Sequence, residues 1–191
     1  MAVFSKQSLI TELLDRTELI KASTQLFLRL NDDQLNCKVV PDTWSIAEIF
    51  EHLNIKNGIY IRSILPRITK APDVPAEKYI SGWLGDWIYN RIMPRPDGSI
   101  FRIRALKAHC ANAERLNGRE TIQCFLQQCD SIDDILRHVS TKDLRRIKIP
   151  FSFTNLLRFR LGDNLRYLIA HSERHLLQAH RVMGELPALP I

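Results

Sequence analysis

One stretch decides how this chain folds: Leu161-Gly-Asp-Asn-Leu-Arg-Tyr-Leu-Ile-Ala-His171-Ser-Glu-Arg-His175-Leu-Leu-Gln178-Ala-His180-Arg-Val-Met183. Its apolar residues recur at spacings of three, four and seven, which predicts one amphipathic helix. His175 falls inside the apolar stripe and His171 at its edge, about 40° apart around the axis and roughly 6 Å apart along it. His180 points away from both. Two imidazoles placed in this way can share a metal ion, although two hydrogen-bonded core histidines would have the same spacing.

A third histidine lies on a second predicted helix, over residues 45–68. Ser45-Ile-Ala-Glu48 has the pattern of a capping box, and Trp44 before it is expected to pack as a staple against Ile49. His52 lies about 60° from Ile49 around the helix axis, at the border of the predicted inner face. It is therefore the candidate third ligand. The alternative is a boundary histidine that is hydrogen-bonded to a neighbouring side chain.

The composition favours an all-α fold in a single domain that spans residues 1–191. Hydrophobic residues make up 45% of the chain and glycines number only 7, so long periodic segments are better explained by helices than by a β-sandwich. We expect a four-helix bundle. The four helices are predicted near residues 5–30, 45–68, 120–139 and 161–183.

The segments between these helices carry further predictions. Residues 66–104 are rich in proline and are expected to be a long irregular connection between the second and third main helices. A short helix is expected within it, with Trp83 and Trp87 on one face, either as core packing or as the wall of a ligand pocket. Another helical segment is predicted at 105–116. Near the last helix, residues 145–150 are expected to be extended, Thr154 to cap an early turn and Gly162 to mark a break.

Several classes of protein are disfavoured by the sequence. No Cys-x-x-Cys pair is present, and four unpatterned cysteines suggest reduced thiols in the cytoplasm. No signal peptide is recognisable and no stretch approaches 18 apolar residues, so we expect a cytoplasmic protein without a membrane span. The formal net charge is +6, but its basic clusters do not alternate with a nucleic-acid-binding motif. We therefore do not expect nucleic acid as a partner.

Common catalytic motifs are also missing. A zincin requires His-Glu-x-x-His, whereas here the run is His171-Ser-Glu-Arg-His175, and Glu173 lies about 160° around the helix from His175. A di-iron bundle requires Glu-x-x-His pairs, and the chain has none. Gly-x-Ser-x-Gly and phosphate-binding glycine loops are absent as well. Three histidines with an open fourth position would instead form a zinc site of the catalytic type.

Two segments of the chain resemble the DinB-like helical bundle superfamily. Trp44-Ser45-Ile-Ala-Glu-Ile-Phe-Glu-His52-Leu53 is similar to the family's Trp-Ser-x-x-(apolar)-x-x-His-Leu segment. The run from Leu161 to Gln178 resembles its C-terminal His-x-x-x-His-x-x-Gln helix. Because these segments bracket most of the chain, the resemblance implies a four-helix bundle, commonly a homodimer, with a divalent metal on His52, His171 and His175. Zinc or nickel is the metal that imidazole ligands favour.

The resemblance also implies a range of functions. Characterised relatives include thiol-dependent transferases that use bacillithiol or mycothiol, and related isomerases, whereas many members have no known activity. We therefore expect transfer of a low-molecular-weight thiol to an electrophilic small-molecule substrate. The alternatives are a non-catalytic metal-binding or stress-response module and a metal-dependent hydrolase. Glu48 or Gln178 is a candidate to orient a ligand, and the candidates to attract the carboxylates of a thiol are Arg158, Arg160, Arg166 and Arg174.

Overall fold

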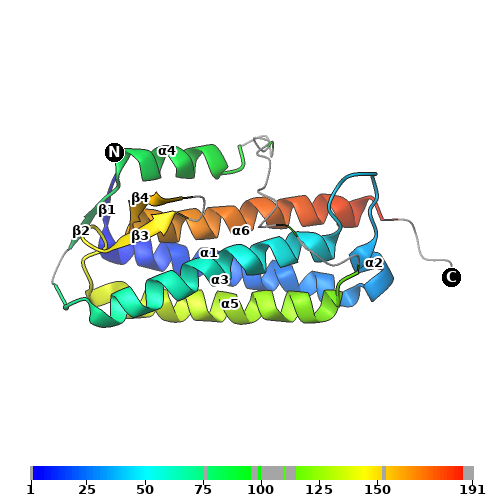
Figure 1. The fold of residues 1–191 in the computed structure, drawn as a ribbon, viewed down its shortest axis with the longest axis horizontal. Helices are drawn as coiled ribbons and strands as arrows, with labels where there is room; N and C mark the ends of the chain where they lie inside the picture. The colour runs from blue at the N-terminus through cyan, green and yellow to red at the C-terminus, as the bar shows by residue number, and fades with distance from the viewer. Residues whose placement is uncertain are drawn as a thin grey trace.

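The computed structural model describes residues 2–74, 77–95, 99, 110, 115–151 and 154–186, and it confirms the all-α fold. Four long helices lie side by side along the molecule (Figure 1). They are α1 (Lys6–Thr24), α3 (Ile46–Lys70), α5 (Gly118–His138) and α6 (Leu161–Gly184). No helix in the described part of the chain has a stretch long and apolar enough to cross a bilayer.

The long helices run in two directions. Helices α1 and α6 run one way and α3 and α5 the other, as the colours of Figure 1 show. Each of α3 and α1 packs against both α5 and α6. Because α3 and α5 are parallel, the chain must return along the whole bundle between them, and α3 alone is about 37 Å long. This explains why the connection between α3 and α5, residues 71–117, is longer than the other connections between the four long helices.

The sequence of α3 explains its start and its packing. Ser45 accepts a hydrogen bond from the backbone N–H of Glu48, and the Glu48 carboxylate accepts one from the N–H of Ser45, which confirms the predicted capping box. The inner face of α3 packs with those of the other three helices in one apolar core. The core includes Leu9, Leu13 and Ile20 of α1, Ile49, Phe50, Leu53 and Ile64 of α3, Ile122, Phe125 and Leu136 of α5, and Leu165, Leu168 and Ala179 of α6.

Short elements close the two ends of the bundle. Strand β1 (Val3–Ser5) pairs antiparallel with β2 (Lys78–Ile80), and β3 (Lys148–Phe151) pairs antiparallel with β4 (Thr154–Arg160). Helix α4 (Trp83–Ile92) packs outside the bundle along α6. The remaining elements in the described part of the chain are the 3-10 helices Gln25–Arg29 and Val139–Thr141 and the short helix α2 (Asp32–Asn36).

The boundaries of some predicted elements are wrong. The first α-helix ends at Thr24 and continues as a 3-10 helix, rather than running to residue 30. Thr154 lies in strand β4 and caps no helix. Helix α6 begins at Leu161, where the N–H groups of Leu161 and Gly162 donate to the carbonyls of Ile147 and Leu144, so Gly162 marks no break. Apart from Cys110, Arg115 and Leu116, the helical segment predicted at 105–116 lies outside the described residues.

Two glycines let the outer elements approach α6 closely. A Cβ at Gly162 would lie 2.5 Å from the Tyr79 ring of β2, and a Cβ at Gly85 of α4 would lie 2.5 Å from the Asp163 side chain. Asp163 is buried in the first turn of α6, where it accepts hydrogen bonds from the Ser81 hydroxyl and the Gly82 N–H. The absence of side chains at these glycines therefore lets β2 and α4 rest directly on the start of α6.

Candidate metal centre

Three histidines from two helices meet inside the bundle. His52 is on α3, and His171 and His175 are one turn apart on the antiparallel neighbour α6. The ring centroids lie 5.2 Å apart for His52 and His171, 4.7 Å for His52 and His175, and 4.6 Å for the pair on α6. All three side chains are buried. The three histidines that were predicted from the sequence are far apart in the chain, and the fold brings them together.

The spacing of the ring nitrogens is compatible with one metal ion. Each histidine offers a nitrogen, and these three atoms all lie within 4.8 Å of one another. The Nε2 atoms of His52 and His171 are 3.4 Å apart. Two nitrogens that bind the same zinc ion tetrahedrally at 2.0–2.1 Å would be separated by roughly 3.3 Å. The residues present therefore fit a small divalent cation with imidazole ligands.

Burial keeps the imidazoles of His171 and His175 neutral, as metal binding requires. Burial, together with the neighbouring His52, lowers the pKa of His175 to about 3. It also lowers the pKa of His171 well below its usual range, with added repulsion from His175 and His52. A protonated imidazole has no lone pair for a metal, so a neutral ring is the binding form. At neutral pH both rings on α6 can accept a cation without first losing a proton.

A hydrogen bond to Gln178 orients His175. Gln178 lies three residues further along α6, and its Oε1 is 3.0 Å from Nδ1 of His175. Because an amide oxygen only accepts, Nδ1 of His175 carries the proton and Nε2 keeps its lone pair for the cluster. This is the arrangement that usually supports a metal-binding histidine. The structure therefore favours Gln178 rather than Glu48 as the residue that orients a ligand.

Aromatic rings surround the cluster on two sides. The Trp44 ring lies 4.9 Å from that of His52 and 6.0 Å from that of His175. The Tyr167 ring stacks on His171 at 5.5 Å. Trp44, which was expected to pack against Ile49 at the start of α3, contacts histidines from two helices. The sequence gives no signal for this contact, because the contact depends on where α6 lies.

The tryptophan pair on α4 is not part of the core. Trp83 is 72% exposed and Trp87 is 59% exposed, while the opposite side of α4, with Gly85, faces α6. The prediction that Trp83 and Trp87 pack in a core is therefore wrong. In the described part of the chain, the tryptophan in contact with the histidines is Trp44.

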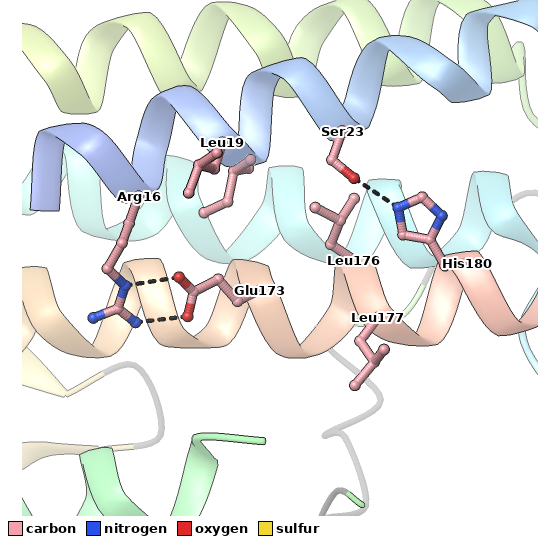
Figure 2. Close-up of a pocket in the computed structure, with 8 residues that line it drawn as sticks. Arg16, Leu19, Ser23, Glu173, Leu176, Leu177 and His180 are labelled. Atoms are coloured by element: carbon pink, nitrogen blue, oxygen red, sulfur yellow. Dashed lines mark hydrogen bonds and ion pairs between the residues drawn. The ribbon is translucent and has the colours of Figure 1, made fainter. Parts of the chain in front are cut away.

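Two glutamates near the histidines in sequence, Glu48 and Glu173, have other partners. Glu48 caps α3 and pairs with Lys38 at 2.9 Å. Glu173 points to the other side of α6, where its two oxygens contact Arg16 of α1 at 2.6 and 2.7 Å (Figure 2). His180 is on this side as well, 2.6 Å from the Ser23 hydroxyl (Figure 2). This confirms that neither Glu173 nor His180 belongs to the cluster.

Of the candidate arginines, Arg174 is the one placed beside the histidines. Its positive charge contributes to the lowered pKa values of His171 and His175, and its own side chain is buried. Arg160 instead donates to the carbonyl of Ile80, and Arg166 forms an ion pair with Asp86. Arg158 lies on strand β4, opposite Pro150.

A buried lysine near the cluster was not predicted. Lys56 lies one turn beyond His52 on α3 and is only 1% exposed. Its ammonium nitrogen is 5.8 Å from the centre of the Tyr60 ring and 6.0 Å from that of Tyr167. The signal in the sequence is a lysine in register with the inner face of an amphipathic helix, between Leu53 and Tyr60.

Comparison with known proteins identifies one family. A sequence-family model described as the DinB superfamily matches residues 15–179, which include all three histidines. Neither the curated proteins nor the solved structures provide a match.

Proposed function

The chain belongs to the DinB superfamily, and from this membership and the buried histidines we propose a divalent-metal-dependent enzyme that transfers a low-molecular-weight thiol to an electrophilic small molecule. The observation that carries the proposal is the cluster of His52, His171 and His175, whose nitrogens are spaced for a single cation. Three protein ligands leave a coordination position for an exogenous group. Zinc or nickel is the metal we expect.

The surroundings of the cluster favour a thiol over water as the nucleophile. Metal-dependent hydrolases of the zincin type use a glutamate as general base, but Glu48 and Glu173 are engaged with Lys38 and Arg16. A thiol needs less help from a base, since it is far more acidic than water. The positive charges of Lys56 and Arg174 also favour an anionic sulfur nearby.

The proposed reaction requires little of the protein beyond binding and orientation. A divalent cation held by the histidines would lower the pKa of an exogenous thiol and so supply a nucleophile at neutral pH. A carbon–sulfur bond would then form at the electrophilic carbon. From a chlorinated substrate, chloride and the thiol proton pass to solvent, whereas the oxygen of an opened epoxide stays on the product and takes up a proton. Gln178 holds the ring of His175 in place, and the rings of Trp44 and Tyr167 pack against His52 and His171.

Activity can be tested with the metal-loaded protein and a chlorinated or epoxide electrophile. The reaction is run with bacillithiol, mycothiol, glutathione or cysteine, and without any thiol. We expect a thioether that forms only in the presence of metal and thiol, and that is lost in His175→Ala. His180→Ala is the matched control, because His180 is on the same helix but contacts Ser23.

The other outcomes separate the alternatives. A product that forms without thiol would favour a hydrolase. Metal binding without turnover of any thiol would favour a non-catalytic binding module, and either result would contradict the proposal. We also expect a homodimer, for which light scattering should give twice the chain mass of 22.2 kDa.

A further inference from the structure

The buried lysine on α3 is unusual in the interior of a helical bundle. Lys56 is 1% exposed, whereas lysines are almost never fully buried in the absence of a specific interaction. Burial lowers its pKa to about 8, so at neutral pH the ammonium remains mostly charged. The nitrogen lies within cation–π distance of Tyr60 and Tyr167. A positive charge is thus held inside the protein at substantial desolvation cost.

This charge lies beside the three histidines. Lys56 follows His52 by one helical turn, so both project from the same side of α3. Tyr167, whose ring the ammonium faces, stacks on His171. The charge of Lys56 also contributes to the lowered pKa values of His171 and His175.

A second buried cation lies on the same helix as His171 and His175. Arg174 lies between the two histidines of α6 in sequence and is 6% exposed. Its charge acts on both histidines and on the Tyr167 hydroxyl. Two buried cations therefore lie in the same region as the three neutral imidazoles, and their positive charge makes the region suited to an anion.

We propose that Lys56 and Arg174 form an anion subsite that binds a carboxylate of the thiol co-substrate while its sulfur reaches the three histidines. The inference rests on the proposed function, and it narrows the co-substrate to thiols that carry a small anionic group. Lys56 acts here through its charge at a fixed position on α3, with Tyr60 and Tyr167 confining the ammonium. Neutral thiols of equal size would lack this contact.

Isothermal titration of the zinc-loaded protein with three small probes tests this subsite. The probes are 3-mercaptopropionate, the neutral thiol 2-mercaptoethanol and propionate, which has no thiol. We expect the wild type to bind 3-mercaptopropionate at least about tenfold more tightly than 2-mercaptoethanol, because a buried charge pair contributes substantially to binding. Lys56→Met should abolish this preference and Lys56→Arg should largely keep it. Arg174→Met should reduce it independently.

The matched control is a second buried lysine. Lys142 is 7% exposed, and it pairs with Asp73 and donates to the Ala71 carbonyl. Lys142→Met should leave the thiol preference unchanged. The subsite is refuted if Lys56→Met weakens both thiols equally, if it changes neither, or if no carboxylate binds to the wild type. Propionate that binds through Lys56 while neither thiol binds would instead contradict thiol transfer and leave the subsite standing.

Discussion

The hydrogen bond between His175 and Gln178 should determine how tightly the cluster binds a metal. Without the amide oxygen, the proton of His175 is no longer held on Nδ1 and the ring is free to turn. Gln178→Leu is therefore expected to weaken zinc affinity by about 10- to 100-fold. Competition with a chromogenic chelator measures the affinity, with His180→Asn as the control that should retain it. Unchanged affinity in Gln178→Leu would show that the amide plays no part.

The buried histidines should make the metal-free protein sensitive to acid. Folded His171 and His175 have lowered pKa values, about 3 for His175, whereas in the unfolded chain a histidine titrates near its ordinary value of about 6.5. Between these values the unfolded chain binds more protons, so acid favours unfolding. The unfolding free energy should fall by roughly 1 kcal/mol per pH unit for each histidine below about pH 6.5.

Urea denaturation at pH 8.5, 7.5, 6.5 and 5.5 measures this dependence. His175→Gln removes one titrating ring and should make the decline shallower below pH 6.5, with no change in its slope above pH 7.5. If the unfolding free energy fell equally steeply with pH in both proteins, His175 would not contribute to the sensitivity to acid.

Single residues could be predicted from the sequence where the helical period alone decides their position. His52, His171 and His175 were identified in this way, together with the family resemblance. The contact of Trp44 with His52 and His175 could not be predicted, because it depends on the placement of α3 against α6. Lys56 was overlooked because a lysine is normally assigned to a solvated face. The identity of the three ligands remains a prediction until a metal is measured.

At the scale of elements, the contact of β2 with α6 should depend on the missing side chain at Gly162. A methyl group there would overlap the Tyr79 ring, which is buried and cannot easily move aside. Gly162→Ala is expected to destabilise the protein by about 1–3 kcal/mol. Gly184→Ala, at the other end of the same helix, has no atom within 4 Å of its new methyl group. It should be neutral or slightly stabilising.

Thermal or urea denaturation of both glycine variants provides the comparison. Equal stability of Gly162→Ala and Gly184→Ala would contradict the close contact between the Tyr79 ring and Gly162.

The elements divide clearly into those that the sequence could predict and those that it could not. Helices α3, α5 and α6 have strong apolar periods, and the cap of α3 is local, so their positions were predicted closely. Strand β4 was mistaken for the beginning of a helix because Thr154 also suits a helix cap. Its pairing with β3 supplies hydrogen bonds that no local pattern reveals. The cap of α6 is likewise non-local, since carbonyls of residues 144 and 147 accept from its first N–H groups.

At the scale of the whole molecule, metal binding should stabilise the bundle. The ligands come from α3 and α6, so a metal that binds all three histidines binds only the folded chain. Zinc at 100 times its dissociation constant should raise the unfolding free energy by about 2.7 kcal/mol. Differential scanning calorimetry with and without zinc measures the rise, and His171→Ala should remove most of it. A melting temperature that does not respond to zinc in the wild type would contradict a three-histidine site.

The order of the helices along the chain also sets the order of events during synthesis. His52 leaves the ribosome 119 residues before His171, and α3 meets α5, its parallel neighbour, before α6 exists. Contacts between such distant residues form slowly, since a long loop must close first. We therefore expect the histidine cluster to be among the last features to form. A newly made chain whose three histidines can bind one ion together has already brought α3 and α6 side by side.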